Sequence, residues 1–581
     1  MRNSKSIEKT PYGAISAGSD FTVSVLVEGI EEAVLHVRYD TSETESFPMS
    51  ADTDGRLSAS CRCEKTGLYF YAVEFPGIGF ASYGDTIDSR VHWFQQTVYD
   101  GMYSAPKGFA GGIMYQIFPD RFNASPEPDE KAFPERVFHK DKSDLPSYLP
   151  DADGKQRNND FFGGTFRGIE EKLDYLASLN VSIIYLNPIF KSCSNHRYDT
   201  FDYLQPDPLL GTEEDFTSLC HSAAERGMRV ILDGVFSHTG ADSIYFDELD
   251  RFGNGALHHP KTSPYTSWFN RRGDSFHYWW GFTNLPEVNE MDPSFSEFIT
   301  GEGGVIDHWI GLGASGFRLD VADELPDEFI EKIYRAVKRH GDDTLLIGEV
   351  WEDASNKVSY GRRRKYLYGH ELDGVMNYPA RTAIIEFMRN GDGDLFMDRI
   401  AHLAENYPFS MMSNCMNSIS THDTARALTS LVLDDPGDRE IQARTMLGHS
   451  DYLLAVEMFK LATAIQFAIP GIPCIYYGDE IGMQGFRDPF NRGYFRWDSP
   501  DRNVLSAVRK ITEKHAELRD VLEFGTFNPV DSGSGYIAFT RRSEDSEVLF
   551  AVNTSDTAIH VIYKKADFVL QPWSYFFERI G

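Results

Sequence analysis

The sequence predicts an α/β protein, a (β/α)8 TIM barrel flanked by an N-terminal and a C-terminal β-sandwich. Residues 107–518 alternate short apolar segments with amphipathic segments, as parallel strands joined by crossover helices do. Residues 1–106 and 519–581 instead alternate apolar and polar residues in short runs. A chain of 581 residues is also longer than one hydrophobic core usually organises, so we expect several domains.

The N-terminal region, residues 1–106, is predicted to be a β-sandwich. Residues 21–27 and 34–39 alternate apolar with polar side chains, and clusters of Gly, Asp and Ser separate such runs. Aromatic residues gather towards the end of the region. Core packing or a domain interface is the favoured interpretation of these residues, and a platform that stacks on glycans is the alternative. They are Tyr69, Phe70, Tyr71, Phe75, Trp93 and Phe94.

Eight apolar runs in the middle of the chain are predicted to be the barrel strands. They lie at residues 113–118, 183–186, 230–236, 317–321, 345–350, 375–378, 418–421 and 474–477. Apolar residues between these runs recur at helical spacing. The clearest helical faces are formed by Ile169, Leu173, Leu176 and Leu179 and by Phe329, Ile333 and Val337. A further helix over residues 503–517 is predicted to close the barrel.

The composition excludes some classes of partner. A formal net charge of -32 repels a phosphate backbone and anionic membranes, so a neutral ligand suits the surface better than nucleic acid or a membrane. No stretch approaches the roughly 20 apolar residues of a membrane span, and no apolar run follows the basic residues at the N-terminus, so a cytoplasmic location is expected. The 6 cysteines lack metal-ligand spacing, which favours free thiols.

Three acidic residues lie in short motifs near the carboxyl ends of predicted strands. They are Asp320 in Gly316-Phe317-Arg318-Leu319-Asp320, Glu349 in Ile347-Gly348-Glu349-Val350-Trp351, and Asp423 in Ser420-Thr421-His422-Asp423. Each motif alone is also explained by an acid that caps a helix or pairs with a nearby Arg. A barrel enzyme places its chemistry at this end of its strands. Cleavage of a sugar bond needs one carboxylate to attack and one carboxylic acid to protonate the leaving oxygen.

These motifs resemble the signature segments of the alpha-amylase family of glycoside hydrolases. Three further segments agree: Asp-Gly-Val-Phe-Ser-His at residues 233–238, His-Arg-Tyr-Asp at 196–199, and Gly-Ile-Pro-Cys-Ile-Tyr-Tyr-Gly-Asp-Glu at 471–480. The resemblance spans about residues 110–500. It implies that the long connection at about 239–295, which is rich in aromatic residues, is an inserted lobe after the third strand that walls one side of the cleft.

A subgroup resemblance is carried by Leu-Pro-Glu-Val-Asn at residues 285–289, which is similar to the Met-Pro-Lys-Leu-Asn segment of the neopullulanase, cyclomaltodextrinase and maltogenic amylase subgroup. An N-terminal sandwich before the barrel is also similar to that subgroup. Glu287 reverses the charge of the usual Lys, and Asp323 before Glu324 departs from the usual Asn-Glu, which puts the preference for acceptor sugars in doubt. Residues 487–497 resemble bacterial amylopullulanases, which keeps α-1,6 cleavage open.

The family resemblance implies catalytic roles for the three acids. Asp320 is the expected nucleophile, Glu349 the acid and base, and Asp423 the residue that stabilises the distorted sugar ring. Arg318 lies two residues before Asp320, on the same strand face, and can keep that carboxylate ionised. Glu349 must instead hold its proton near neutral pH, which requires a drier pocket or a nearby negative charge.

Further residues are implied to contact the sugar. His238 and His422 resemble imidazoles that bind sugar hydroxyls, and a satisfied structural histidine is the alternative for each. Tyr198, with His196 nearby, resembles the platform under the cleaved sugar. Asp488 and Arg492 resemble the pair that closes the donor end, although Asp488 could instead cap a turn. Trp351 completes the predicted substrate-binding set.

A structural calcium ion is the expected cofactor, and no organic cofactor is expected. Asp151, Asp153, Asn158, Asp160 and Gly163 offer oxygen ligands at loop spacing similar to the family's site. Thr165 stands where relatives often carry Asp, which removes one charged ligand. A plain acidic surface loop is the alternative interpretation.

The expected function is retaining hydrolysis of α-1,4-glucosidic bonds in maltooligosaccharides, cyclodextrins, pullulan or starch, through a covalent glycosyl-enzyme intermediate. The partner is thus an α-glucan oligo- or polysaccharide. Two alternatives stay open: a transglycosylase, isomerase or branching enzyme with the same machinery, and a non-catalytic glycan-binding protein on an amylase-like barrel. The N-terminal sandwich could pair two chains into a homodimer, or could sit on its own barrel.

Overall fold

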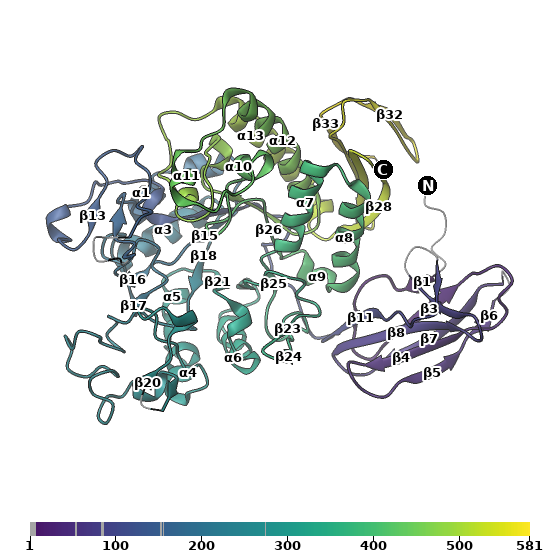
Figure 1. Cartoon of the computed structure of the whole chain (residues 1–581), viewed down its shortest axis with the longest axis horizontal. Helices are drawn as coiled ribbons and strands as arrows, with labels where there is room; N and C mark the ends of the chain where they lie inside the picture. Colours follow the sequence, from purple (N-terminus) through teal and green to yellow (C-terminus); the bar gives the residue numbers. More distant parts are fainter. Residues whose placement is uncertain are drawn as a thin grey trace.

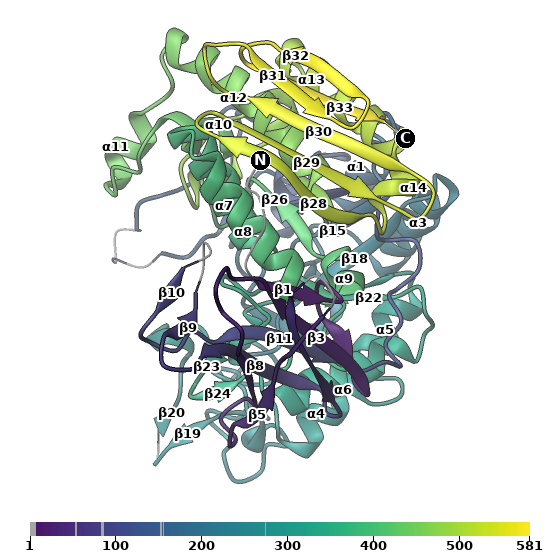
Figure 2. The same cartoon turned by 90° about the vertical axis from the view of Figure 1, so that its right-hand side faces the viewer.

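The computed structural model describes residues 7–52, 55–82, 86–150, 154, 156–273 and 275–580. A barrel forms the centre of the molecule, and two β-rich domains lie together on one side of it. The N-terminal domain, in purple, and the C-terminal domain, in yellow, both lie to the right of the barrel in Figure 1. In the turned view of Figure 2 they face the reader, one above the other.

The N-terminal domain is a sandwich of two sheets, as predicted. One sheet has the order β1-β3-β7-β6, and the other has the order β10-β9-β8-β11-β2 with β4 and β5 added alongside β8. The strands are β1 (Ile7–Thr10), β2 (Ile15–Ser16), β3 (Ser19–Val25), β4 (Val34–Tyr39), β5 (Glu45–Pro48), β6 (Ser50–Ala51), β7 (Leu57–Cys63), β8 (Gly67–Phe75), β9 (Gly79–Ala81), β10 (Ile87–Asp88) and β11 (Phe94–Tyr99). Alternate residues of each long strand face the shared core.

The aromatic residues near the end of this domain serve mainly the core and the domain interface. Tyr69, Tyr71 and Phe75 are buried in the sandwich core. Phe70 lies between Arg38 of the same domain and Arg363 of the barrel. The domain contact is extended by an ion pair from Arg363 to Asp40 at 3.2 Å and by hydrogen bonds between Gln95 and the barrel residues Ser355 and Asn356.

The central domain is an eight-stranded parallel barrel in the order β25-β22-β21-β18-β15-β12-β27-β26. A parallel bridge between Met376 and Met416 joins the two ends of the sheet. Each of the eight predicted runs overlaps one of its strands. They are β12 (Met114–Ile117), β15 (Ile183–Leu186), β18 (Arg229–Gly234), β21 (Gly316–Leu319), β22 (Leu345–Gly348), β25 (Gly374–Val375), β26 (Met416–Ser418) and β27 (Ile472–Tyr476).

Two predicted runs share only one residue each with a strand of the barrel. The run at 375–378 ends as a strand at Val375, because Asn377 caps the helix α7 that begins at Tyr378 and Pro379 follows in its first turn. The run at 418–421 leaves the sheet after Ser418 and continues as the loop that carries His422 and Asp423. The chain thus leaves the sheet for a helix in the first place and for a polar loop in the second.

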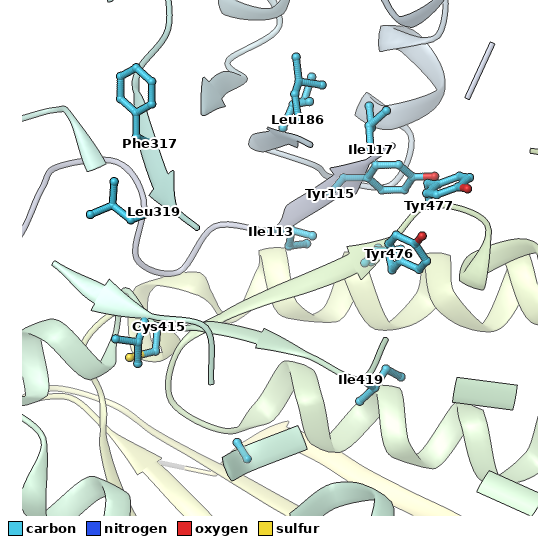
Figure 3. Close-up of a cluster of buried hydrophobic side chains, with 14 of the residues drawn as sticks. Ile113, Tyr115, Ile117, Leu186, Phe317, Leu319, Cys415, Ile419, Tyr476 and Tyr477 are labelled. Atoms are coloured by element: carbon cyan, nitrogen blue, oxygen red, sulfur yellow. The ribbon is translucent and has the colours of Figure 1, made fainter. Parts of the chain in front are cut away.

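Side chains of the barrel strands fill two separate apolar layers. One layer lies inside the barrel and includes Met114, Ile183, Ile231, Ile347 and Cys474. The other lies between the strands and the surrounding helices, where Figure 3 shows the side chains of Ile113, Tyr115, Ile117, Leu186, Phe317, Leu319, Cys415, Ile419, Tyr476 and Tyr477. Because both faces of each strand are buried, the strands appear in the sequence as continuous apolar runs.

The helices pack around the outside of the barrel. They are α1 (Phe166–Glu170), α2 (Leu173–Ala177), α3 (Glu213–Glu225), α4 (Pro293–Thr300), α5 (Val305–Gly311), α6 (Asp327–Lys338), α7 (Tyr378–Asn390), α8 (Gly393–Asn406), α9 (Phe409–Met412), α10 (Ala427–Val432), α11 (Arg439–Arg444), α12 (His449–Ala468), α13 (Arg502–Glu517) and α14 (Arg519–Leu522). The predicted helices at 329–337 and 503–517 are confirmed as α6 and α13. The face at 169–179 is buried as predicted but is divided between α1 and α2, because the chain leaves helical geometry at Lys172.

The connection between β18 and β21 forms the inserted lobe. It contains the short elements η3 (Thr266–Trp268), β19 (Arg271–Arg272), β20 (Ser275–Phe276) and η4 (Trp279–Gly281) before α4. Its aromatic side chains pack on one another; the ring centroids of Phe246 and Phe269, for example, are 5.0 Å apart. A bridge between His238 and Glu287 ties the lobe to the loop after β18. In Figure 1 the lobe lies beside the barrel around the labels β20 and α4.

Other short elements lie in the loops of the barrel. They are η1 (Pro119–Arg121), η2 (Glu130–Ala132), β13 (Val137–Phe138), β14 (Asp160–Phe161), β16 (Phe190–Ser192), β17 (Thr200–Pro206), η5 (Ala322–Glu324), β23 (Val358–Ser359), β24 (Arg362–Arg363), η6 (Asp479–Ile481) and η7 (Phe490–Arg492). In the described ranges no helix combines the length and the apolar character that crossing a bilayer requires.

The C-terminal domain returns to β structure, as predicted. One sheet has the order β28-β29-β30-β33, and β31 pairs with β32. The strands are β28 (Thr526–Gly533), β29 (Tyr536–Arg542), β30 (Glu547–Asn553), β31 (Ile559–Tyr563), β32 (Ala566–Leu570) and β33 (Ser574–Arg579). The buried Arg541 donates a hydrogen bond to the carbonyl of Ala468 at the end of α12, which fixes this domain to the barrel.

Candidate active site

Four carboxyl groups meet at the carboxyl end of the barrel: those of Asp233, Asp320 and Glu349 are buried, and the side chain of Asp423 is 31% exposed. Asp233 lies on β18, Asp320 follows β21, Glu349 comes directly after β22, and Asp423 follows β26 in the chain. Parallel strands bring these ends to one face of the barrel. The residues that the motifs singled out are therefore assembled in one place, although more than a hundred positions separate Asp320 from Asp423 in the sequence.

The buried guanidinium of Arg318 connects three of these carboxyl groups. Its Nη1 lies 2.7 Å from Oδ1 of Asp233 and 2.9 Å from Oδ1 of Asp320, and its Nη2 lies 2.6 Å from Oε2 of Glu349. The contact with Asp320 was expected from the sequence. The contacts of Arg318 with Asp233 and Glu349 were not expected from the sequence. Because one planar fork binds both Asp320 and Glu349, their carboxyl groups lie side by side across a short gap.

Glu349 is held by two further donors. The backbone N–H of Val321 donates to Oε2 at 2.9 Å, and the indole of Trp351 donates to Oε1 at 2.9 Å. The Trp351 ring stacks on Tyr378, with centroids 3.8 Å apart. Val321 has a left-handed backbone (φ 43°), which is unfavourable for a β-branched residue. The strained turn therefore aims an N–H group at the predicted acid.

The carboxyl cluster favours retention of a proton. Burial raises the pKa of Asp320 well above its ordinary value; Arg318 opposes this effect, and Glu349, Asp233 and Asp423 add to it. Burial likewise raises the pKa of Asp233 and of Asp423. Since neighbouring carboxyl groups titrate together, the retained proton belongs to the cluster. A shared proton in a buried site is what an acid next to a nucleophile requires.

Tyr198 and His422 form a stacked pair beside Asp233. Their rings are 5.5 Å apart and nearly parallel, and the Tyr198 hydroxyl donates to Oδ2 of Asp233 at 2.8 Å. The amide of Gln116 donates to Nδ1 of His422, which leaves the proton on Nε2, 3.1 Å from Asp423. Burial lowers the pKa of His422 well below its ordinary value, so its imidazole is neutral.

Arg492 links the predicted donor-end pair to Asp423. Its Nη1 lies 2.9 Å from Oδ1 of Asp488, and its Nη2 lies 3.4 Å from Oδ1 of Asp423. The structure thus favours the predicted ion pair over a turn cap for Asp488. The neighbouring Asn491 is buried and donates to the carbonyls of Thr421 and His422, which fixes the loop that carries Asp423.

The other two predicted histidines, the buried His238 and the partly buried His196, belong to hydrogen-bond networks. Nε2 of His238 lies 3.1 Å from the Tyr198 carbonyl and its Nδ1 lies 2.9 Å from the Ser237 hydroxyl. Burial lowers the pKa of His238 to about 3. His196 accepts a hydrogen bond from the backbone N–H of Tyr198. This arrangement corresponds to the structural alternative for His238, and its contact with sugar stays a prediction.

Several residues of the site were not identified from the sequence. Tyr185 donates to Oδ2 of Asp233 at 2.7 Å, and Asn187 donates to the Tyr198 hydroxyl at 3.1 Å. Gln116 lies on the first barrel strand. Gln116 and Tyr185 are polar residues inside apolar runs, and this pattern could have identified them from the sequence. A polar side chain on a buried parallel strand needs a buried hydrogen-bond partner.

The predicted calcium ligands are only partly described. Asp151 and Asp153 lie outside the described residues. Oδ1 of Asp160 accepts from Asn195, and its Oδ2 lies 3.0 Å from both His139 and the backbone N–H of Ser147. In the ranges that the structure describes, no three acidic, His or Cys side chains form a ready metal site. Both oxygens of the Asp160 carboxylate are thus engaged by protein groups, and an ion at this site stays a prediction.

Comparisons with known proteins agree with this geometry. Residues 116–528 match the family model described as the alpha amylase catalytic domain. The chain is 32% identical to an amylopullulanase of Thermoanaerobacter thermohydrosulfuricus, over 96% of this chain and 41% of that protein. It is 30% identical to the intracellular maltogenic amylase of Bacillus subtilis, over 84% of this chain and 76% of that protein.

A solved structure with the same architecture is the type III pullulan hydrolase from Thermococcus kodakarensis. It has a TM-score of 0.71 and 25% sequence identity, and the match covers 97% of this chain and 98% of that one. The chain spans less than half the length of the amylopullulanases that it matches.

Proposed function

The chain belongs to the alpha-amylase family, and on this premise we propose that it is a retaining glycoside hydrolase that cleaves α-1,4-glucosidic bonds of α-glucans. One observation carries the proposal: the Arg318 guanidinium binds Asp320 and Glu349 together at the ends of two adjacent strands. Retaining enzymes need two carboxyl groups about 5 Å apart, because one of them must reach the anomeric carbon itself.

The proposed reaction has two steps. Asp320 attacks the anomeric carbon while Glu349 gives its proton to the glycosidic oxygen, so the bond to the leaving sugar breaks as an ester to Asp320 forms. Glu349 then takes a proton from water, the water oxygen bonds to the anomeric carbon, and Asp320 is released. In this proposal the carboxylate of Asp423, which contacts Arg492, stabilises the sugar ring as that ring develops positive charge.

The proposed substrates are maltooligosaccharides, cyclodextrins, pullulan and starch. The similarity to a pullulan hydrolase and to amylopullulanases supports pullulan and keeps α-1,6 cleavage in the proposal. The subgroup segment at 285–289 supports cyclodextrins. Transfer of the glycosyl group to a second sugar competes with hydrolysis for the same intermediate, so the two activities share every residue named above.

Product analysis tests this proposal against its alternatives. The purified chain is incubated with maltotriose, pullulan and cyclodextrin, and the anomeric form of the new reducing ends is followed by NMR. We expect shorter α-glucans that first appear as α-anomers. Products of higher mass or new linkage would identify a transglycosylase, isomerase or branching enzyme, and binding without any product would favour the non-catalytic alternative.

Three finer statements belong to the same proposal. A homodimer through the N-terminal sandwich is supported by Ile78 and Ile87, which are exposed at one end of that domain, and sedimentation tests it. A cytoplasmic location is supported by similarity to an intracellular maltogenic amylase, and cell fractionation tests it. Structural calcium near Asp151 and Asp153 is tested by chelation with EDTA, which then lowers the melting temperature, with added magnesium as the control.

A further inference from the structure

One carboxylate joins the inserted lobe to the loop that follows the predicted nucleophile. Glu324 lies in η5, four residues after Asp320. Its Oε1 accepts from the indole N–H of Trp280 at 2.6 Å, and its Oε2 accepts from the indole N–H of Trp279. Two neighbouring tryptophans in η4 are therefore fixed by the two oxygens of a single side chain. We call these three residues the tryptophan clamp.

The tryptophan clamp holds a large aromatic surface open to solvent. Trp280 is 75% exposed although its N–H is bound, and its left-handed backbone (φ 49°) is unfavourable. Trp279 meets it edge to face, with ring centroids 6.4 Å apart, and stacks on Phe282, which is 56% exposed. An indole that is strained, anchored and still uncovered contributes little to the core, so its exposed face is available for a ligand.

The position of the clamp relative to the scissile bond follows from Glu349. The backbone N–H groups of Val321 and Ala322 donate to the Glu349 carboxylate and carbonyl, and η5 continues directly from there to Glu324. Asp423, Arg492 and Asp488 lie instead on the flank formed by the last two strands. The acid protonates the leaving oxygen, so the leaving sugar lies on the side of Glu349 that carries the clamp.

The electrostatic surroundings agree with this placement. Burial raises the pKa of Glu324, the two indole hydrogen bonds oppose that effect, and the nearby Glu287 and Glu349 add to it. The clamp is thus close enough to the predicted acid for their charges to interact. Tyr360, which is 77% exposed at the turn between β23 and β24, is a second aromatic ring near Glu324.

We propose that Trp280, held by Glu324, is the platform on which the leaving part of an α-glucan chain stacks. Trp280 is then a specificity-determining residue that favours substrates with a glucosyl unit beyond the cleaved bond, and Glu324 is a positioning residue. The inference rests on the proposed function. In this proposal the flat apolar face of the indole contacts the C–H groups of a pyranose ring. The hydrogen bond of the indole N–H prevents rotation of the ring.

Kinetics with two kinds of leaving group test this inference. The variants Trp280→Ala, Trp280→Phe and Glu324→Gln are compared on maltotetraose and on p-nitrophenyl α-maltoside, whose leaving group is not a sugar. For Trp280→Ala we expect kcat/KM on maltotetraose to fall about tenfold, mainly through KM, and the value on the aryl maltoside to change less than about twofold. Trp280→Phe is expected to retain part of the preference for maltotetraose over the aryl maltoside, and Glu324→Gln is expected to lose part of that preference. Equal losses on both substrates would overturn the inference.

Trp573 offers a matched control. It too has a left-handed backbone (φ 50°) and an indole N–H bound to a carboxylate, that of Asp556, but it lies in the C-terminal domain. Trp573→Ala is expected to change neither substrate's kinetics. The melting temperature of each variant is measured to exclude unfolding.

A binding measurement separates this inference from the proposed function. Maltotetraose is titrated calorimetrically into Asp320→Asn and into the double variant Asp320→Asn with Trp280→Ala, neither of which needs to turn over. A roughly tenfold weaker affinity of the double variant supports the inference. Equal affinities contradict it alone. Binding to the wild type without any cleavage contradicts the proposed function alone, and the absence of binding to every form contradicts both.

Discussion

The floor of the candidate active site and its aromatic rim differ in how their side chains are held. The floor, made of Arg318, Asp233, Asp320 and Glu349, is buried, and charged hydrogen bonds hold its carboxyl groups from several sides. The rim, made of the tryptophan clamp, Phe282 and Tyr360, is largely exposed and is anchored mainly through Glu324. Changes at the floor therefore alter chemistry and stability together, whereas changes at the rim alter the choice of substrate.

The largest effect is expected at the predicted acid. Glu349→Gln removes the proton that the leaving oxygen needs, so kcat/KM on maltotetraose should fall about 1000-fold. The value of kcat/KM on the aryl maltoside should fall less, because its leaving group needs little protonation. The exposed Glu352 is the matched control, since it pairs only with Lys357 among the described contacts. A loss below tenfold in Glu349→Gln would remove Glu349 from the mechanism.

Arg318 is expected to matter for stability as well as for catalysis. Arg318→Met leaves three buried carboxyl groups without their shared cation, and breaking such a network costs about 3–5 kcal/mol. Thermal melting should show the barrel transition at a clearly lower temperature. Arg62→Met is the control, because Arg62 is exposed on the N-terminal sandwich. Unchanged melting of Arg318→Met would show that the floor does not depend on this cation.

The buried His238 predicts loss of stability in acid. Its folded pKa of about 3 lies below the ordinary value near 6.5, so the unfolded chain binds a proton over this range that the folded chain does not. Stability is therefore full above about pH 6.5 and falls as the pH drops towards about 3, by about 2–3 kcal/mol at pH 4.5.

Melting temperatures at pH 7 and pH 4.5 test this dependence. The melting temperature of His238→Gln should fall less between pH 7 and pH 4.5 than that of the wild type, because the amide does not titrate. His560→Gln changes an exposed histidine of the C-terminal domain and should behave as the wild type. If the melting temperature of His238→Gln falls in acid as much as that of the wild type, other groups cause the loss of stability.

The smallest effect is expected at the rim. Tyr360 has a left-handed backbone (φ 49°) with 77% of its surface exposed, so Tyr360→Gly should relieve about 1 kcal/mol of strain and raise the melting temperature slightly. Val321→Gly makes the same backbone change at the floor, where it also loosens the turn whose N–H holds Glu349. Val321→Gly should lose activity, and its melting temperature should not rise as that of Tyr360→Gly does. Equal behaviour of both variants would remove the distinction between floor and rim.

Much of the fold could be predicted because its signals are local. Barrel strands buried on both faces appear as unbroken apolar runs, as at residues 183–186, where the strand boundaries match. Amphipathic helices such as α6 repeat their apolar residues every three or four positions. The break between α1 and α2 was missed, since the apolar repeat continues across Lys172 while only the backbone changes.

The sequence by itself determined the chemical types in the candidate active site and their order: two acids after neighbouring strands, a third acid later, and an arginine two residues before the first. It also predicted the contact of that arginine with the first acid, but only the tertiary structure decided the partners that lie far apart in the chain. The contact of Arg318 with Glu349 and that of Glu324 with two tryptophans join residues far apart in the chain. The physical reason is that composition and periodicity report which face of an element is buried, whereas a hydrogen bond depends on how separate elements close around the same space.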